Sequence, residues 1–561
     1  MTARDLIRAE LVRAARRLGA PESVEPVLER PRDPSHGEWS TNVAMLLARP
    51  LGRKPRDIAQ ALLDAMDLAA AGVERIEIAG PGFINFYVAA GANARELADV
   101  VRAAEHFGRH ETGNGERVIV EFVSANPTGP LHVGHGRQAA LGDAISSLLE
   151  WTGWSVSREF YYNDGGTQIE NLALSVLARI DALRGSAAGY RIPEGGYHGE
   201  YVTDIARRFE EQNPGFDLRP AGGGPDPRLP DDRLDCVARF AVRELRKEQD
   251  LDLQAFGVTF DTYFLESSLY TDGKVEETVA ALVAAEHTYE RDGALWLRTT
   301  DFGDDKDRVM RKSNGAFTYF VPDVAYHLTK WQRGFRRAIN VQGADHHSTV
   351  TRVRVGLQAL DAGIPEGYPE YVLHQLVTVM RGGEEVKISK RAGSYVTVRD
   401  LIDEVERDAV RYFYLMRKGD SQLVFDIDLA RSQSEENPVY YIQMAHARMC
   451  GIFRVGQIDA AGVSADGVDF AVLAEPEEQQ LIKALLDFPD VVQGAAVALE
   501  PQRVAGYLLE TARTAHLWYH KHHVLNEPPR IMAARLLLAR ATQIVLRNGL
   551  SILGVSAPER M

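Results

Sequence analysis

A short buried strand, joined by a tight turn to a long amphipathic helix, limits the fold classes open to this chain. The strand is the apolar run 118–123, and the turn after it contains Asn126-Pro127-Thr128-Gly129-Pro130. In the following helix apolar residues recur at intervals of three and four, as one stripe that would face a sheet: Leu141, Ala144, Ile145, Leu148 and Leu149. This order of elements is typical of the first unit of a nucleotide-binding α/β domain.

Composition excludes several classes of protein. The chain has 561 residues, enough for roughly three or four domains, and a formal net charge of −15, so a surface covered with positive charge is excluded. Two cysteines, Cys236 and Cys450, cannot build a disulfide framework and indicate a cytoplasmic protein. No apolar run is long enough for a membrane helix. The N-terminus contains Asp5 and Glu10, so we interpret it as a surface helix rather than a signal or transit peptide.

Changes of pattern along the chain predict three regions. Residues 1–110 begin with an amphipathic helix and contain a strand-like run at 82–88, and residues 111–430 alternate strands with helices. The second region carries an insertion at about 170–300, a loop rich in Pro and Gly at 211–232, and further strands at 294–299, 338–341 and 371–380. Residues 431–561 have helical periodicity alone.

The end of the chain is locally basic. Residues 501–561 contain eight Lys or Arg and three Glu, a net charge of +5. The pattern fits a docking surface for a polyanion and equally fits a solvated basic helix face.

Two imidazoles lie where the helix after the first strand begins, in Pro130-Leu131-His132-Val133-Gly134-His135-Gly136. The free backbone N–H groups and the dipole of a helix N-terminus favour an anion there, and glycines let a flat base or a phosphate approach the backbone. We therefore expect a phosphate or nucleotide site. The pattern alone also fits ordinary polar residues or half of a zinc site, for which further ligands are missing nearby.

A second, basic segment lies about 250 residues later, where Lys387, Lys390 and Arg391 follow a strand and the Gly382-Gly383 turn. Three cations on a loop suit a triphosphate whose charge shifts as pyrophosphate leaves, although alone they are more typical of a solvated loop. The chain has no G-x-x-x-x-G-K-[ST] motif, so ATP would bind without a P-loop. The histidine and lysine segments together indicate ATP more strongly than either does alone.

These two segments resemble the signature motifs of class I aminoacyl-tRNA synthetases. His132-Val133-Gly134-His135 is similar to the HIGH motif, and Lys387-Ile388-Ser389-Lys390 is similar to the KMSKS loop, with Arg391 in place of its last serine. Other stretches resemble the arginyl-tRNA synthetases in particular, and the resemblance extends over nearly the whole chain. They are residues 80–86, 121–130, 162–164, 319–323, 437–441 and 558–561.

The resemblance implies an α/β fold with a Rossmann-type catalytic domain, an N-terminal α+β domain that contacts the tRNA D-arm and a helical anticodon-binding domain. It implies ATP-dependent ligation of L-arginine to tRNA(Arg) through arginyl-adenylate. ATP would enter as its Mg²⁺ complex, without a tightly bound cofactor or a protein metal site. The implied catalytic residues are His132, His135, Lys387 and Lys390, and the implied ATP-binding residues are Pro130, His132, Gly134, His135, Gly136 and Lys390.

The resemblance also implies which side chains select the substrates. A planar, permanently charged guanidinium is best bound by carboxylates, and a carboxylate within an apolar strand is costly unless it is paired. The implied arginine-binding residues are Glu121, Ser124, Asn126, Tyr319, Asp323 and Asp345, the last standing where some relatives have glutamine. Phe83, Asn85 and Tyr440 are expected at the tRNA, although Phe83 and Asn85 also suit plain strand positions. We expect a monomer without a membrane partner.

Three alternatives stay open on sequence grounds. Another class I synthetase, for example one for glutamate, would need cations in place of Glu121 and Asp323. A small-molecule adenylyltransferase shares an H-x-G-H segment, but it would leave the two terminal regions without a purpose. A synthetase-like protein that only binds RNA would not need His132, His135 and Lys390.

Overall fold

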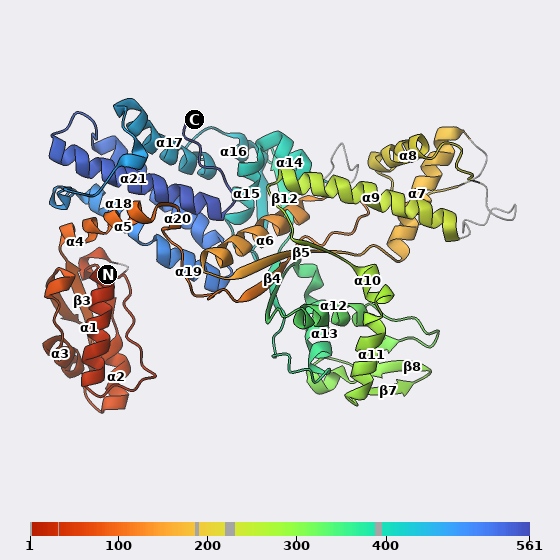
Figure 1. Ribbon diagram of the computed structural model, residues 1–561, viewed down its shortest axis with the longest axis horizontal. Helices are drawn as coiled ribbons and strands as arrows, with labels where there is room; N and C mark the ends of the chain where they lie inside the picture. The colour runs from red at the N-terminus through yellow and green to blue at the C-terminus, as the bar shows by residue number, and fades with distance from the viewer. Residues whose placement is uncertain (1–2, 32, 186–189, 219–230, 387–394) are drawn as a thin grey trace.

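The computed structural model describes residues 3–31, 33–185, 190–218, 231–386 and 395–561. Figure 1 shows an elongated molecule with a small N-terminal unit toward one end, a helical insertion at the other and a parallel sheet between them. None of the helices in these ranges combines the length and the apolar character that crossing a bilayer requires.

The N-terminal unit packs helices against an antiparallel sheet of order β1-β3-β2 (Trp39–Thr41, Phe83–Val88 and Val73–Ala79). The helices are α1 (Ala3–Arg17), α2 (Val43–Leu51) and α3 (Pro55–Ala65). Helix α1 and strand β3 confirm the predicted helix and strand of this region. The core of the unit ends at Val88, whereas Leu97 and Val100 of α5 (Leu97–Ala103) pack with the rest of the chain. The packing therefore changes well before residue 110, where the sequence analysis ends this region.

Five parallel strands form the central sheet in the order β11-β10-β4-β5-β6. Their bounds are Arg117–Glu121 (β4), Ser155–Tyr162 (β5), Thr262–Leu265 (β6), Arg337–Gly343 (β10) and Glu370–His374 (β11). This topology confirms the predicted Rossmann-type fold. Because all five strands run in one direction, the residues that follow them meet at a single edge of the sheet, where open α/β proteins bind ligands.

Helices cover both faces of the sheet. Helix α6 (Val133–Trp151) lies on one face, and the predicted stripe from Leu141 to Leu149 is buried there against Val118 and Val120. Helices α12 (Phe320–Gln332) and α13 (His347–Gln358) cover the other face. The alternation of side chains along β4 thus turns Ile119 and Glu121 toward α12.

The single strand expected at 371–380 is two strands in two sheets. Strand β11 ends at His374 and pairs with β10, whereas β12 (Val377–Arg381) pairs with β14 (Leu423–Asp426) and with β13 (Glu384–Glu385). Between the two strands, the Gln375 carbonyl accepts a hydrogen bond of 2.8 Å from the Arg137 guanidinium of α6. This contact holds the chain between the two strands, where His374 and Gln375 interrupt the apolar residues of the run.

The insertion between β5 and β6 is helical, with its own core. It contains α7 (Thr167–Arg184), α8 (Glu200–Gln212) and α9 (Asp231–Ala255). Between β6 and α12 lie α10 (Glu266–Thr271), α11 (Lys274–Ala284) and the antiparallel sheet of β7 (Thr288–Arg291), β8 (Ala294–Leu297) and β9 (Arg308–Arg311). Of the expected loop at 211–232, residues 219–230 lie outside the described residues.

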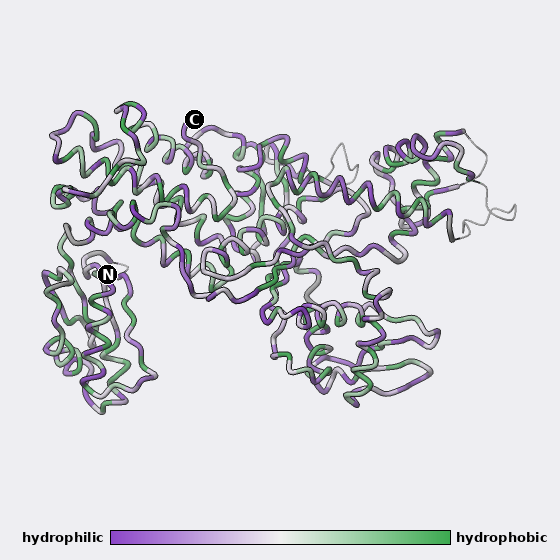
Figure 2. Tube along the Cα trace, viewed as in Figure 1, coloured by the Kyte–Doolittle hydropathy of each residue, from purple (hydrophilic) through white to green (hydrophobic). Residues whose placement is uncertain are grey.

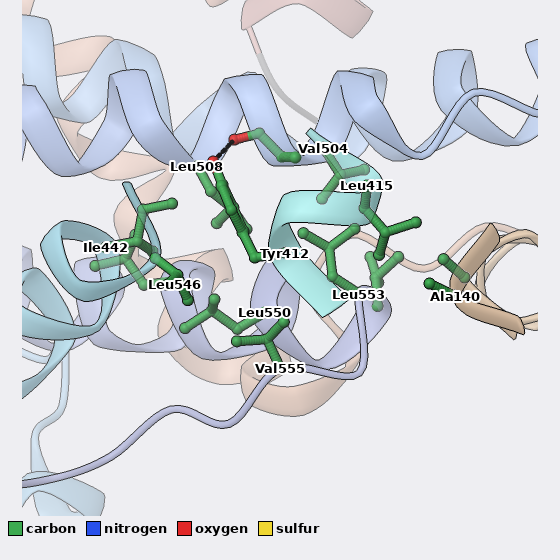
Figure 3. Close-up of a cluster of buried hydrophobic side chains, with 14 of the residues drawn as sticks. Ala140, Tyr412, Leu415, Ile442, Val504, Leu508, Leu546, Leu550, Leu553 and Val555 are labelled. Carbon is green, nitrogen blue, oxygen red and sulfur yellow. Dashed lines mark hydrogen bonds between the residues drawn. The ribbon is translucent and has the colours of Figure 1, made fainter. Parts of the chain in front are cut away.

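The C-terminal region is helical, as predicted. Helices α14 (Val398–Val405) and α15 (Arg407–Leu415) precede β14, and the later helices are α16 (Ile427–Arg431), α17 (Pro438–Gly456), α18 (Pro476–Leu486), α19 (Phe488–Ala498), α20 (Gln502–Lys521) and α21 (Pro529–Ile552). Hydrophobic and hydrophilic residues alternate along these helices (Figure 2), and the buried apolar side chains belong to one core. Figure 3 shows how Tyr412 and Leu415 of α15 pack with Ile442, Leu508 and Leu550, so this region and the catalytic region share one core.

A fully buried arginine joins the parts of this shared core. The guanidinium of Arg411 donates to the Leu553 carbonyl at 2.9 Å, to the Phe256 carbonyl at 3.1 Å and to the Asp143 carboxylate at 2.5 Å. One side chain thus connects α15 with α6, with the end of the insertion and with the C-terminal segment. Gly554 has to lack a side chain, because a Cβ there would lie 2.2 Å from the guanidinium.

We predict that Arg411→Met destabilises the fold by about 3–5 kcal/mol, because it leaves the Asp143 carboxylate and two buried carbonyls without their donor. Urea unfolding followed by circular dichroism measures the change. Arg417→Met, at an exposed arginine six residues away, is the control and should shift the midpoint very little. Equal midpoints for the two variants would contradict the role of Arg411.

Candidate active site

The two histidines of the helix N-terminus cap one another. Nδ1 of His132 accepts from the backbone N–H groups of Gly134 at 3.0 Å and of His135 at 3.3 Å, and Nδ1 of His135 accepts from the His132 N–H at 3.3 Å. The rings stack with their centroids 3.6 Å apart. Because each Nδ1 is an acceptor, each neutral ring carries its proton on Nε2. The turn therefore presents two N–H donors at a helix N-terminus.

These histidines are neutral at neutral pH. Burial lowers the pKa of His132, and burial together with the neighbouring His132 and His374 lowers the pKa of His135 well below its usual value. They can therefore stabilise phosphate charge as hydrogen-bond donors and through the helix dipole, without a net positive charge of their own.

Segment 395–398 lies beside this turn. The Val398 N–H donates to the Leu131 carbonyl at 2.9 Å, the Val133 N–H donates to the Val396 carbonyl at 3.1 Å, and the Tyr395 hydroxyl donates to the Pro130 carbonyl at 2.9 Å. The predicted catalytic residues Lys387 and Lys390 lie outside the described residues. Tyr395, the fifth residue after Lys390, and the residues that follow it are thus hydrogen-bonded to the histidine turn.

The glycines of the turn serve packing. A Cβ at Gly136 would lie 2.7 Å from Val398 and 3.0 Å from the Tyr414 ring, and one at Gly134 would lie 2.8 Å from the His132 ring. Gly136 therefore allows α6 to approach α14 and α15, whereas the sequence interpretation assigned these glycines to the approach of a ligand. Next to the turn is a cleft of about 640 Å³, whose lining includes Asn126, Pro130, His132, His135, Gln168 and Tyr395.

The turn after β4 has an unusual backbone. Val123 and Ser124 have φ values of 68° and 41°, a conformation that is strained for a β-branched residue and that clusters at functional sites. It directs the Ser124 hydroxyl to the Glu121 carboxylate at 2.9 Å, and this hydroxyl also accepts from the Tyr161 N–H at 3.3 Å. Asn126 follows and donates to the Gln168 side chain at 2.6 Å. Three of the predicted arginine-binding residues are thus brought together on one turn.

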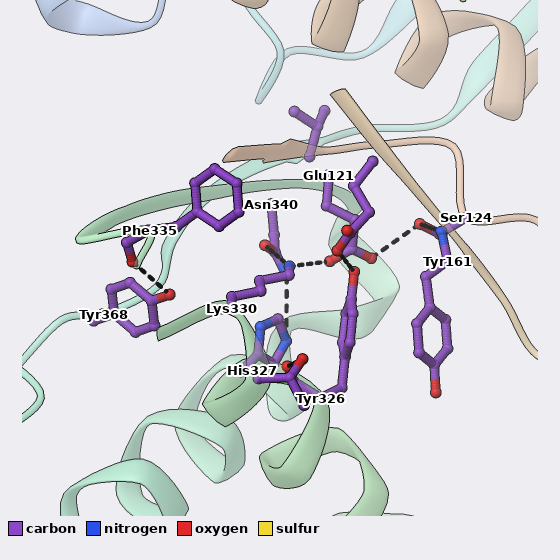
Figure 4. A network of polar contacts seen from close by, with 12 residues as sticks. Glu121, Ser124, Tyr161, Tyr326, His327, Lys330, Phe335, Asn340 and Tyr368 are labelled. Atoms are coloured by element: carbon purple, nitrogen blue, oxygen red, sulfur yellow. Dashed lines mark hydrogen bonds and ion pairs between the residues drawn. The ribbon is translucent and has the colours of Figure 1, made fainter. Parts of the chain in front are cut away.

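Acidic side chains gather beyond this turn, under α12. Glu121 is buried and its Oε2 lies 2.5 Å from the ammonium group of the buried Lys330 (Figure 4). Glu266, directly after β6, accepts from the Tyr161 hydroxyl at 2.8 Å. Burial, with the negative charges of Glu266 and Glu121, raises the pKa of Asp323 to about 7. A cation bound near such a carboxyl would stabilise its charged form.

Sequence reasoning missed Glu266, Tyr161 and Lys330. A signal for Glu266 was present, because it directly follows a strand and strand ends meet at the binding edge.

A second hollow, of about 490 Å³, lies beside the start of α12, and its lining includes Tyr319, Glu266 and Gln168. The Tyr319 side chain is 77% exposed. Burial also raises the pKa of Glu266 above its usual value.

The other predicted residues lie in different surroundings. Asp345 follows β10, and its charge acts on His132 and His374, so it lies toward the histidine side of the edge. In the N-terminal unit Phe83 is exposed, whereas Asn85 is buried and accepts from the Ser40 hydroxyl at 2.7 Å. Tyr440 lies in the first turn of α17, half-buried. The structure thus does not bring Phe83, Asn85 and Tyr440 to the edge that carries His132 and Asp323.

The parallel sheet carries a histidine pair at the start of the helix after its first strand, and segment 395–398 is hydrogen-bonded to that turn. These features are typical of a class I aminoacyl-tRNA synthetase. Models of three families match the chain. The catalytic domain described as tRNA synthetases class I (R) matches residues 97–183 and 235–434, the arginyl tRNA synthetase N terminal domain matches 1–88, and the DALR anticodon binding domain matches 442–561. The chain belongs to the arginyl-tRNA synthetase family.

Similar sequences support the same family, and solved structures support the same fold. The arginine–tRNA ligases of Geotalea daltonii and Bordetella petrii are each 57% identical to this chain, over 95% of both sequences. The fold is similar to that of the Thermus thermophilus arginyl-tRNA synthetase, with a TM-score of 0.77 over 100% of both chains at 23% identity. It is also similar to the Plasmodium falciparum enzyme, with a TM-score of 0.74 over 99% of this chain and 98% of that one at 17% identity.

We predict that the apparent KM for arginine falls about tenfold between pH 6 and pH 8, because the pKa of about 7 leaves Asp323 mostly protonated at the lower pH. The guanidinium itself stays charged throughout. Charging assays across this range, with the KM for ATP as the internal control, measure the effect. In Asp323→Asn the pH dependence should disappear. A wild-type KM for arginine that does not vary with pH would contradict this assignment.

Proposed function

We propose that this chain ligates L-arginine to tRNA(Arg) for protein synthesis, using ATP and releasing AMP and pyrophosphate. The observation that carries the proposal is the acidic group of Asp323, Glu266 and Glu121, which lies at the same sheet edge as the His132–His135 turn. A guanidinium and a polyphosphate have opposite charges, and this edge offers each of them a matching surface. A glutamate-specific pocket would need cations at these positions instead.

The reaction then has two steps. An arginine carboxylate oxygen attacks the α-phosphorus of ATP, and the bond to pyrophosphate breaks to give arginyl-adenylate. The terminal ribose hydroxyl of the tRNA attacks the carbonyl carbon, loses its proton and displaces AMP. His132 and His135 donate hydrogen bonds to phosphate oxygens as charge develops, together with Lys387 and Lys390 of the basic segment. ATP brings Mg²⁺ with it; among the described residues, no cluster of three His, Cys, Asp or Glu side chains is arranged to hold a metal ion.

The substrate contacts follow from where the side chains lie. Asp323 and Glu266 face the guanidinium, with Tyr319 beside them and Glu121 behind. Ser124 and Asn126 lie toward the backbone end of arginine, and Asp345 lies toward the histidines. Pro130 lines the cleft on its ATP side, whereas Gly134 and Gly136 act through the packing of the histidine turn beside it.

In this proposal the tRNA contacts both terminal regions of the chain. The exposed Phe83 belongs to a surface of the N-terminal unit for the D-arm, and Tyr440 belongs to the helical region for the anticodon stem and loop. All the residues that we assign to the arginine and ATP sites belong to one chain, so we propose a monomer. We also propose that it acts in the cytoplasm.

Aminoacylation with total tRNA, ATP and each of the twenty amino acids separately tests the function. We expect charging with arginine alone. Pyrophosphate exchange with and without tRNA, in the same experiment, shows whether the tRNA completes the site. Charging with a different amino acid would remove Asp323 and Glu266 from the pocket, and no charging by intact protein would overturn the proposal.

The histidine assignment has its own test. His135→Ala should lower the turnover number roughly 10²–10³-fold, because a donor to the developing phosphate charge is lost, while the KM for arginine changes little. His135→Asn is the matched variant, since its amide oxygen can still cap the helix but no donor reaches the Nε2 position. We expect it to be about as slow. Turnover restored by Asn would show that His135 acts only through the cap.

A further inference from the structure

The turn that leads into the histidine pair, residues 126–130, is held by side chains from outside it. No helix or strand includes this turn, and its two prolines, Pro127 and Pro130, have no N–H group to donate. The carbonyl groups of such a segment need donors from elsewhere in the molecule. Because His132 begins α6 two residues later, the backbone of the turn sets where the histidines lie.

The three helices of the insertion all contact this turn. The Tyr201 hydroxyl of α8 donates to the Thr128 carbonyl at 2.9 Å. The Gln249 side-chain amide of α9 donates to two carbonyls, that of Asn126 at 3.1 Å and that of Gly129 at 2.8 Å. Helix α7 is reached by the Asn126 side chain, at 2.6 Å. The insertion is therefore attached to the catalytic region at the turn that precedes the histidines.

Gln249 lies where α9 passes from the insertion into the catalytic region. The preceding part of the helix packs in the core of the insertion, through Val237, Phe240 and Leu245, whereas Leu253 belongs to the core that the catalytic and C-terminal regions share. Gln249 is fully buried between them. Its amide has one acceptable orientation, because the opposite one would place the amide oxygen against two carbonyls. A single continuous helix thus joins the insertion to the turn.

Gly129 shows how closely the donors surround the turn. A Cβ at this position would lie 3.2 Å from the Tyr201 hydroxyl and 2.9 Å from the Tyr395 hydroxyl. Tyr395 also meets the His132 ring edge to face, with the ring centroids 5.8 Å apart. The insertion and segment 395–398 therefore contact the same turn.

We propose that Tyr201 and Gln249 are positioning residues for the reaction at ATP. They hold the backbone of turn 126–130, and thereby keep the Nε2 N–H groups of His132 and His135 where charge develops on the phosphate. They act through the histidine turn and do not bind ATP themselves. This inference rests on the proposed function. It gives the helical insertion a part in catalysis, because a displacement of about 1 Å at a catalytic group can lower a rate roughly 100-fold.

The test compares Tyr201→Phe and Gln249→Met with wild type in the full chain, since each change removes a donor and keeps most of the side-chain volume. Pyrophosphate exchange in the presence of tRNA gives the turnover number and the KM for ATP, and active-site titration counts the competent molecules. We expect the turnover number to fall about fivefold for Tyr201→Phe and about thirtyfold for Gln249→Met, with the KM for ATP within about threefold of wild type.

Tyr190→Phe is the matched control. The Tyr190 hydroxyl donates to the Leu218 carbonyl at 2.7 Å, near Asp181 in the last turns of α7 and far along that helix from the end that Asn126 contacts. The variant thus loses the same kind of hydrogen bond within the insertion but away from the turn. Its turnover number should stay within about twofold of wild type. Equal losses in Tyr190→Phe and Tyr201→Phe would overturn the inference.

A double-mutant cycle with His135→Ala decides whether the effect passes through the histidine turn. In the His135→Ala background, Gln249→Met should lower the remaining turnover by less than about threefold, because the group that it positions is already absent. The same loss in both backgrounds would overturn the inference and leave Gln249 as a structural residue of the insertion. If Gln249→Met does not fold, the same cycle with Tyr201→Phe decides. Wild-type protein that neither exchanges pyrophosphate nor charges tRNA would instead be a failure of the proposed function, seen before any variant is made.

Discussion

Buried charge fixes the position of α12, and the substrate pocket depends on where that helix lies. Apolar packing alone would let a helix slide on a sheet at small cost, because hydrophobic contacts are not directional. The contacts of Lys330 with Glu121 and Asn340, and those of Tyr326 and Arg333 with Glu159, require one register. Asp323 is placed by that register, on a helix that would otherwise have no unique position.

One part of the candidate site favours an anion and the other favours a cation, and the spacing of the strands sets the distance between them. In the proposed ATP site, neutral histidines, backbone N–H groups and a helix N-terminus favour an anion. In the proposed arginine site, carboxyl groups with raised pKa values favour a cation. Both surfaces lie at the ends of neighbouring parallel strands, the geometry that the proposed reaction between an arginine carboxylate and a phosphate requires.

The N-terminal unit is joined to the body differently from the C-terminal helices. Its contacts with α19 include ion pairs of Arg30 with Asp487 and of Arg4 with Asp490, and both guanidinium groups lie on the Trp39 ring. The helical region instead shares a continuous apolar core with the catalytic region and is tied to it by the buried Arg411. A charged and partly exposed junction is weaker than a shared core, and it is more sensitive to salt.

Local patterns predicted much of this architecture. The periodicity of α6, the run that forms β4 and the helical C-terminal region could be recognised because each depends on a repeat of a few residues. The histidine and lysine segments could be recognised because their chemistry is carried by adjacent residues. The division of 371–380 into two strands was not predicted, although His374 and Gln375 interrupt the run, because it depends on the two halves pairing in different sheets. The acidic pocket was only partly predicted, because Glu266 and Tyr161 reach it from different strands.

The amino-acid sequence by itself determined the class of fold, the residues of the histidine turn and the family resemblance, since all of these are properties of neighbouring residues. Only the tertiary structure decided that Glu121 is paired with Lys330, that Asp323 is left as the carboxyl with a raised pKa, and that Gly136 serves helix packing. These properties arise from residues far apart in the chain that meet at one sheet edge, and the strength of a charge there is set by burial and by neighbours that no local pattern records.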